Sequence, residues 1–175
     1  MVLRSFAMLR THYPELLLVL VPRHPPRFDK AAGLCLAEGL TLSRRSQGVG
    51  AKNAEVFLLD TLGELRLFYA ASDIAFVGGS LVPVGGHNVL EPALAGVPVV
   101  FGPHMFNFEE AARKLIEAGG AIGVQNEKGL TEQVVMLLND TEMRQQMGAK
   151  GKLFVESGRG ALAKVEEALA DLMAS

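Results

Sequence analysis

The chain lacks tryptophan, contains one cysteine among its 175 residues, and has no apolar run long enough to cross a bilayer. A membrane-spanning helix needs about 20 consecutive apolar residues, whereas the apolar run at 16–21 ends at Pro22. The first residues also lack the apolar core and the cleavage site of a signal peptide. We therefore expect neither a spanning helix nor a secretory signal.

The single cysteine, Cys35, excludes an internal disulfide. Such sparse use of cysteine fits a reducing, cytoplasmic setting. Cys35 lies within the apolar run at 31–37. We therefore expect a buried structural thiol there rather than a reactive one.

Charge and motif content exclude several classes of protein. With 17 basic and 19 acidic side chains the formal net charge is −2, so the sequence shows no basic footprint for nucleic acid. No G-x-G-x-x-G follows the first apolar run, and no G-x-x-x-x-G-K-[ST] occurs, which argues against a dinucleotide dehydrogenase and a P-loop enzyme. No clustered aspartate pair offers a metal site. We expect no metal, cofactor or nucleic-acid partner.

Apolar runs alternate with helical patterns along most of the chain, which is long enough for one domain with a substantial core. Continuous apolar runs are typical of strands buried on both faces of a parallel sheet. The alternation predicts an α/β fold, a Rossmann-like doubly wound parallel sheet of about six strands. The strands are expected at 16–21, 41–44, 55–59, 74–77, 97–102 and 121–124.

The two ends of the chain are predicted to be helical. Apolar side chains recur at helical spacing from Val2 to Tyr13 without a preceding cap, which suggests a chain that enters mid-helix from a longer protein. Near the other end we expect helices at 131–138, 142–156 and 162–173, with Gly158 and Gly160 breaking the last two apart. An apolar stripe in the last helix is expected to pack against the core; its residues are Leu162, Val165, Leu169 and Leu172.

The stretch 76–92 is the strongest candidate for a ligand site. It indicates a strand, two glycine turns (Gly78-Gly79 and Gly85-Gly86) and a helix that begins near Asn88. Glycine lets backbone approach a ligand closely, and a helix N-terminus favours phosphate. Glu91 would repel phosphate and suits a hydroxyl pair such as a ribose. The alternative is a tight strand-to-helix turn in which Glu91 only favours the helix N-terminus.

Three other loops follow predicted strands. Arg23, His24 and Arg27 come from a proline-stiffened loop after the first strand, and arginine suits phosphate; alternatively, the loop is simply solvated and His24 packs within it. Thr61 and Glu64 match a capping box, or else the turn at 62–64 forms the floor of a base or ribose pocket.

After the fifth predicted strand, His104 is a further candidate for a ligand contact. Asn107 and Glu110 resemble an N-terminal cap for the next helix. All these loops lie at carboxyl ends of parallel strands, where open α/β sheets bind ligands. Phosphate-binding and hydroxyl-binding groups together describe a nucleotide. No residue stands out as a base or nucleophile; Glu91 and His24 are the plausible candidates and both resemble binding residues.

Five strings, in order and well spaced, resemble the lipid A Kdo transferase family, the 3-deoxy-D-manno-octulosonic acid transferases of lipopolysaccharide biosynthesis. They are V-P-R-H-P at 21–25, D-T-L-G-E-L at 60–65, F-V-G-G-S at 76–80, G-G-H-N-V-L-E-P at 85–92 and G-P-H-M-F-N-F at 102–108. The resemblance covers essentially the whole chain but only the C-terminal half of that family. It implies the donor-binding domain of a GT-B glycosyltransferase, without the N-terminal acceptor domain.

The resemblance implies that this domain holds CMP-Kdo, while the absent domain holds the lipid A precursor and contacts the membrane. The resemblance, the glycine turns and the loop after the first strand each contribute to one set of expected donor-binding residues. They are Pro22, Arg23, His24, Leu62, Gly63, Glu64, Gly79, Ser80, Gly86, Asn88, Val89, Leu90 and Glu91.

The family's reaction is metal-independent and inverts the anomeric carbon, and its catalytic base is a glutamate of the N-terminal domain. The resemblance therefore places no catalytic residue in this chain, which alone would be inactive. It places the full-length protein at the cytoplasmic face of the bacterial inner membrane. Pro26 stands where the family usually has an acidic residue, which leaves the role of Arg27 open. A stand-alone nucleotide-binding module and a UDP-sugar transferase or epimerase domain are the alternatives.

Overall fold

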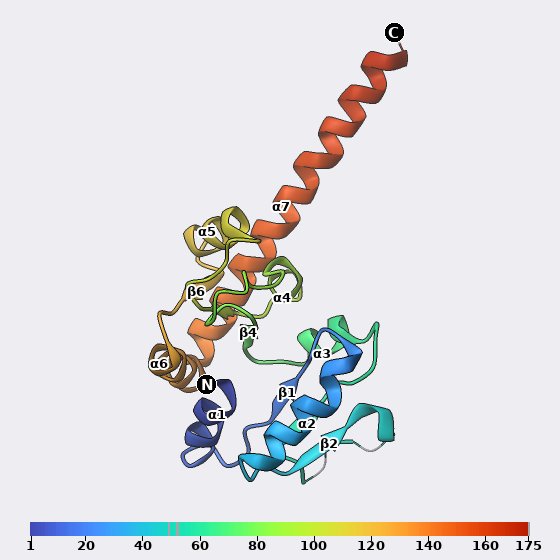
Figure 1. The fold of residues 1–175 in the computed structure, drawn as a ribbon. Helices are drawn as coiled ribbons and strands as arrows, with labels where there is room; N and C mark the ends of the chain where they lie inside the picture. Colours follow the sequence, from blue (N-terminus) through green and yellow to red (C-terminus); the bar gives the residue numbers. More distant parts are fainter. Residues whose placement is uncertain (49, 52, 175) are drawn as a thin grey trace.

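Short parallel strands alternate with helices along the chain, as Figure 1 shows. This computed structural model describes the backbone of residues 1–48, 50–51 and 53–174, and the side chains among them as far as residue 158. The described strands are β1 (Leu18–Leu20), β2 (Leu42–Arg44), β3 (Val56–Leu58), β4 (Ala75–Val77), β5 (Val99–Phe101) and β6 (Ala121–Gly123). Each lies within a range predicted from the sequence, and the α/β class is confirmed.

The strands form two parallel three-stranded sheets rather than one continuous sheet. The first sheet has the order β1-β3-β2 and the second has the order β4-β5-β6. β1 and β4 are therefore edge strands. β1 is only half-buried along its length, whereas the central strands β3 and β5 are fully buried. The prediction of strands buried on both faces is thus confirmed for the central strands β3 and β5. It is wrong for β1, which has a neighbouring strand on one side only.

The helices connect and cover these sheets. They are α1 (Val2–Arg10), α2 (Phe28–Ala37), α3 (Leu65–Ala70), α4 (Leu90–Leu94), α5 (Glu109–Glu117), α6 (Glu127–Asn139) and α7 (Thr141–Ala174). Single 3-10 turns lie at Pro25–Arg27 and Arg45–Gln47. α6 begins four residues before the expected start at Thr131, because the Asn126 side chain caps it by accepting a 3.0 Å hydrogen bond from the Gly129 N–H.

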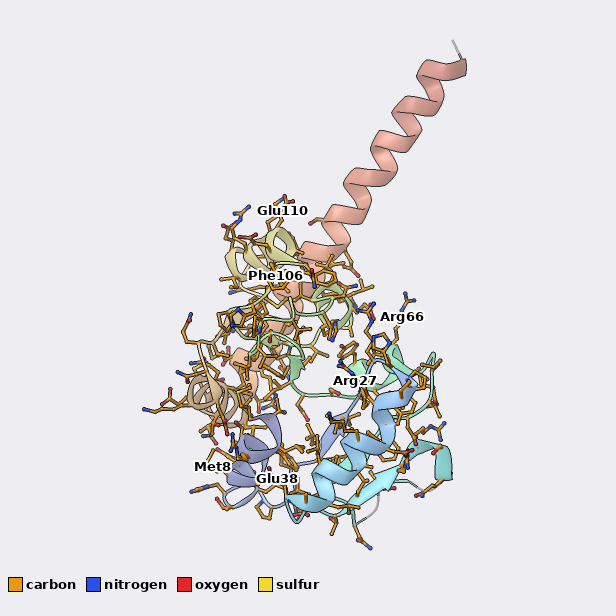
Figure 2. All side chains as sticks on the ribbon, viewed as in Figure 1. Met8, Arg27, Glu38, Arg66, Phe106 and Glu110 are labelled. Carbon is orange, nitrogen blue, oxygen red and sulfur yellow. The ribbon has the colours of Figure 1, made fainter. Side chains whose placement is uncertain are left out.

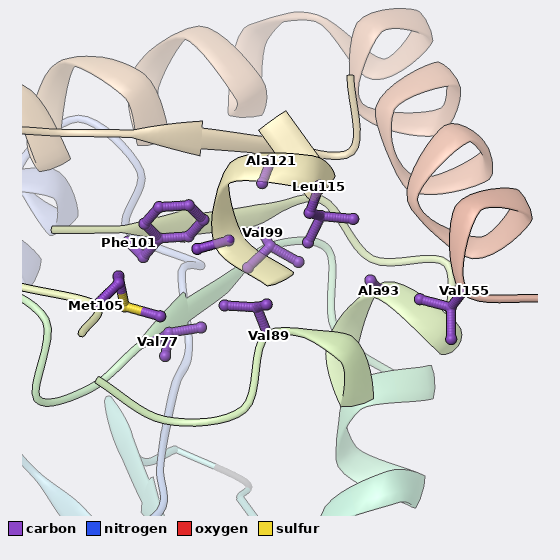
Figure 3. Close-up of a cluster of buried hydrophobic side chains, with 10 residues drawn as sticks. Val77, Val89, Ala93, Val99, Phe101, Met105, Leu115, Ala121 and Val155 are labelled. Atoms are coloured by element: carbon purple, nitrogen blue, oxygen red, sulfur yellow. The ribbon is translucent and has the colours of Figure 1, made fainter. Parts of the chain in front are cut away.

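The core is made of apolar clusters on both sheets. Figure 3 shows the second sheet's cluster, where Val77, Val99 and Phe101 pack against Val89 before α4 and Leu115 of α5. A separate cluster covers the first sheet with Phe6, Cys35, Leu40 and Val56.

Helix α1 connects the two halves of the molecule. Its Phe6 belongs to the first sheet's cluster, while its Val2 packs on a cluster that contains Val100 of β5. Cys35 is 0% exposed, and this burial raises the pKa of its thiol. The structural role expected for this cysteine agrees with that environment.

Helix α7 is one continuous helix, and the predicted break at Gly158 and Gly160 is wrong. A glycine inside a helix costs only about 1 kcal/mol relative to alanine, which the surrounding helix formers outweigh. The last part of α7 extends away from the rest of the molecule (Figure 1). The stripe predicted at 162, 165, 169 and 172 lies outside the described side chains.

Helix α7 packs closely on the second sheet's side of the molecule at two glycines. A methyl group at Gly148 would overlap the carbonyl group of Gly96. At Gly151 the helix lies so close to Gly120 that a methyl group on Gly120 would be 2.5 Å from the Gly151 Cα. The absence of side chains at these positions lets the helix lie against the backbone of the domain.

Substituting Gly148 by alanine tests this packing. We expect Gly148→Ala to lower the free energy of unfolding by about 1–3 kcal/mol, because the new methyl group has no space. Gly158→Ala is a matched control in the same helix, where nothing lies within 4 Å of the added carbon; it should leave stability unchanged or raise it by up to about 1 kcal/mol. Urea unfolding measures both, and equal effects would contradict the packing.

Candidate functional site

Loops after β1, β4 and β5 meet through direct contacts. The Arg23 guanidinium after β1 lies 3.5 Å from the Nδ1 of His87, which belongs to the loop after β4. The backbone N–H of His104, after β5, donates to the carbonyl of Ser80 at 2.9 Å. The Asn107 N–H donates to the Gly85 carbonyl at 3.2 Å. The loops after β1, β4 and β5 thus converge, as the sequence predicted for these three; for the loop after β3 the convergence stays a prediction.

The loop between β4 and α4 is folded by its glycines. The N–H of Gly86 donates to the carbonyl of Gly79 at 3.1 Å. Gly85 and Gly86 are buried, with φ of +100° and +70°. A side chain at Gly85 would overlap Asn107, and one at Gly86 would overlap Met105. These two glycines therefore permit close packing between protein loops; their expected approach to a ligand stays a prediction.

Ser80 holds these two loops together from the inside. Its side chain is 0% exposed. The hydroxyl donates to the Val77 carbonyl at 2.6 Å and accepts from the Gly102 N–H at 2.8 Å. Both hydrogen-bonding functions of this side chain are therefore used inside the protein, where buried polar groups need partners.

Asn88 fixes the start of α4 and the position of Glu91. Its Oδ1 accepts from the Leu90 N–H at 3.0 Å, and its Nδ2 donates to the Glu91 Oε1 at 3.0 Å. Glu91 stays half-buried, whereas the neighbouring Val89 is fully buried in the core. Because α4 has only five residues, its macrodipole is smaller than the sequence argument assumed. The N–H groups of Gly86 and Leu90 already donate to Gly79 and Asn88, so within the described residues the backbone donors left for an anion before the helix include those of His87 and Asn88.

Tyr69 lies close enough to Glu91 to be influenced by it, which sequence reasoning missed. Burial and then the negative charge of Glu91 raise the pKa of Tyr69 to about 12. The phenol is therefore protonated and a hydrogen-bond donor at neutral pH. α3, which carries Tyr69, packs on α4.

A cationic cluster lies at the ends of β1 and β4. Pro22 is half-buried, whereas Arg23, His24 and Arg27 are exposed; Figure 2 labels Arg27. Burial, followed by the charges of these three side chains, lowers the pKa of His87. Like charges gathered on a surface favour an anionic ligand. His87 was not among the predicted site residues, although it sits inside the G-G-H-N string.

The turn at 61–64 is held by ion pairs rather than by a capping box. The Thr61 hydroxyl donates to the Glu64 carboxylate, which also pairs with Arg45 at 2.7 Å. The hydrogen bonds from Arg45 and then Thr61 lower the pKa of Glu64. α3 has no side-chain cap, so the expected capping box is wrong. Gly63 has a φ of +86°, which explains the glycine without any ligand.

This turn is also anchored from the end of β3. Asp60, whose side chain is 3% exposed, accepts a 2.8 Å hydrogen bond from Arg44. It also accepts from the Ser46 N–H at 2.8 Å and from the Ser46 hydroxyl at 2.6 Å. Burial works to raise the pKa of Asp60, but these hydrogen bonds outweigh burial and lower it. Leu62 is 74% exposed at the tip of the turn, so its surface is open.

His104 borders a shallow hollow after β5. The hollow has a volume of about 190 Å³ and is lined by Pro103, Met105, Phe106 and Glu109 as well. Figure 2 labels Phe106, which is exposed. The Asn107 side chain donates to the Val84 carbonyl at 3.3 Å instead of capping α5, whose cap residue has no side-chain hydrogen bond. The expected cap is therefore wrong, and Asn107 joins the two loops.

Two further kinds of feature do not occur in the described part of the chain. No group of three or more histidine, cysteine, aspartate or glutamate side chains is placed to hold a metal ion. No described helix combines the length and the apolar character needed to cross a bilayer. The arrangement therefore offers cations and backbone N–H groups for an anion, and the Glu91 carboxylate for hydroxyl groups.

Known proteins resemble both the sequence and the structure. A family model described as glycosyl transferases group 1 matches residues 1–154. The 3-deoxy-D-manno-octulosonic acid transferase of Haemophilus influenzae is 45% identical over 170 residues, 96% of this chain and 40% of that protein. The same-named protein of Bordetella pertussis is 42% identical over 164 residues, 93% of this chain and 38% of that protein.

A solved structure is also similar. It is the C-terminal CMP-Kdo binding domain of WaaA from Acinetobacter baumannii, with a TM-score of 0.82 and 35% identity over 87% of this chain and 80% of that one. The chain spans about two fifths of the length of the curated relatives it matches. The resemblance to Kdo transferases inferred from the sequence is confirmed.

The buried Ser80 hydroxyl makes a testable contribution to stability. We expect Ser80→Ala to lower the free energy of unfolding by about 1–3 kcal/mol, because a buried N–H and a buried carbonyl lose their partner. Ser157→Ala is the control, since this exposed hydroxyl bonds only to its own helix, and it should change stability by less than about 0.5 kcal/mol. Urea unfolding compares the two; a neutral Ser80→Ala would contradict the role of this clamp.

Proposed function

This chain belongs to the glycosyl transferases group 1 family, and we propose that it is the donor-binding domain of a Kdo transferase. The donor is CMP-Kdo, and the complete enzyme acts in lipopolysaccharide synthesis. The observation that carries this proposal is the likeness to the C-terminal CMP-Kdo binding domain of WaaA. That likeness extends over 80% of the WaaA chain at 35% identity.

The cationic cluster supports a bound phosphate. Arg23 and Arg27 are exposed, and within the described residues neither has a carboxylate within ion-pair distance. An arginine without an internal partner is ready to pair with an anionic ligand. The N–H groups that precede α4 lie in the loop that carries His87, so backbone donors and the Arg23 guanidinium can share one phosphate.

The carboxylate of Glu91 supports recognition of a ribose. Asn88 holds one of its oxygens, which leaves the other free to accept from the hydroxyls of a sugar. The exposed turn at 62–64 lies beside α3, which packs on α4, and offers backbone groups to the nucleoside. Three members of the predicted set, Ser80, Gly86 and Val89, are buried, so in this proposal they shape the loop rather than touch the nucleotide.

In the proposed reaction this domain binds the leaving group. As the glycosidic bond of CMP-Kdo breaks, negative charge develops on the phosphate of CMP, and Arg23 together with the loop N–H groups would stabilise it. A base from a separate N-terminal acceptor domain would deprotonate the hydroxyl of the lipid A precursor. The proposal places that complete protein at the cytoplasmic face of the inner membrane. This chain alone would bind nucleotide without catalysing transfer.

Calorimetric titration of CMP and UMP into this chain tests the proposal. We expect CMP to bind more tightly than UMP, and Arg23→Ala and Glu91→Ala each to weaken CMP binding by about 1–3 kcal/mol, the range for hydrogen bonds to charged groups. Arg113→Ala is the control, because this exposed arginine pairs only with Glu117 on α5. It should leave CMP affinity unchanged.

Two results would oppose the proposal in different ways. Tighter binding of UMP would favour a UDP-sugar transferase or epimerase domain and contradict the Kdo donor. Absence of CMP binding to the folded chain would contradict a donor site built from this domain.

A further inference from the structure

The site lies across the boundary between the two sheets. Arg23 follows β1, an edge strand of the first sheet, and His87 follows β4, an edge strand of the second. These strands do not pair with each other in the described structure. The Arg23 guanidinium lies 3.5 Å from the His87 Nδ1. This contact therefore joins two loops whose strands are not hydrogen-bonded to each other.

The His87 ring lies on the second sheet's side of this boundary. It packs over the turn after β4: a Cβ placed at Gly79 would lie 3.6 Å from the ring Nε2, and one at Gly78 would lie 3.9 Å from the ring Cδ2. The side chain is half-buried. A half-buried histidine has fewer rotatable bonds to order than a long exposed arginine, which loses much rotamer entropy when it is ordered.

The protonation state of His87 suits an acceptor. Burial, followed by the charges of Arg23, His24 and Arg27, lowers the pKa of the imidazole. It is therefore neutral at pH 7, and a neutral ring that carries its proton on Nε2 can accept a hydrogen bond at Nδ1. A neutral acceptor can orient a guanidinium without neutralising it. A carboxylate in the same place would pair with Arg23 and compete with a phosphate.

We propose that His87 is a positioning residue: it holds the Arg23 guanidinium, across the boundary between the sheets, in the orientation that binds the phosphate of the nucleotide. The inference rests on the proposed function, since it assigns a role within the same site. His87 acts through Arg23 and contributes nothing to recognition of the nucleoside. Its effect is to reduce the conformational freedom that Arg23 would otherwise lose on binding.

Titrations of CMP and of cytidine into substituted chains test this role. We expect His87→Ala to weaken CMP binding by about threefold to tenfold, as for loss of one ordinary hydrogen bond, because His87 acts through Arg23 and does not touch the nucleotide, and to leave cytidine binding unchanged. His87→Asn should retain affinity to within about twofold, because its amide oxygen can replace Nδ1 as the acceptor. His12→Ala is the control, since this exposed histidine of the loop after α1 bonds to Thr11.

A double-mutant cycle separates positioning from general support of the loop. In the Arg23→Ala background, His87→Ala should cause no further loss of CMP affinity, because the group through which it acts is gone. Additive losses, equal losses for cytidine and CMP, or an asparagine variant no better than alanine would each overturn the inference. Thermal unfolding of every variant identifies losses that arise from misfolding.

Nuclear magnetic resonance of the histidine rings tests the contact without any ligand. The inference predicts a neutral His87 with its proton on Nε2, and a rise in the pKa of His87 in Arg23→Ala, since removal of a nearby positive charge favours the protonated ring. An unchanged pKa would overturn it. If the native chain fails to bind CMP while this pKa responds, the proposed function fails and the contact between His87 and Arg23 stands.

Discussion

Close packing between the loop after β4 and the loop after β5 is the constraint on which the site depends. Buried glycines let the two backbones meet, and the Ser80 hydroxyl bridges the ends of the two strands by bonding to Val77 and Gly102. Because these contacts are internal, the loop that presents Asn88 and Glu91 is ordered before any ligand arrives. Preorganisation of this kind reduces the entropy that binding would otherwise cost.

The other half of the site is held in a different way. Arg23 belongs to the first sheet, whose edge strand β1 has no ladder to β4. The two halves are joined by packing through α1 and, at the site itself, by the approach of Arg23 to His87. The nucleotide would therefore bind between the loop after β4 and the Arg23 side chain, which reaches across the boundary between the two sheets. The ion pairs of Asp60 with Arg44 and of Glu64 with Arg45 fix the remaining turn.

The sequence was a good guide to elements and a weaker guide to contacts. Continuous apolar runs located five of the six described strands, because burial leaves a direct trace in composition, whereas β2 (Leu42–Arg44) lies in a segment that is not apolar throughout. Edge pairing leaves no such trace, so the split between β1 and β4 was not predicted. Glycine was over-interpreted: α7 runs through Gly158, and Gly85 serves protein packing. The roles of Ser80 and His87 depend on partners from distant loops, which spacing along the chain cannot show.

The central claim is that the loops at the ends of β1 and β4 together hold the phosphate and ribose of CMP. A crystal structure of this chain grown with CMP tests that claim most directly. We expect the phosphate within hydrogen-bond distance of the Arg23 guanidinium and of backbone N–H groups before α4, with the ribose hydroxyls on the Glu91 carboxylate. CMP bound in the hollow beside Phe106, or with its ribose away from Glu91, would contradict it.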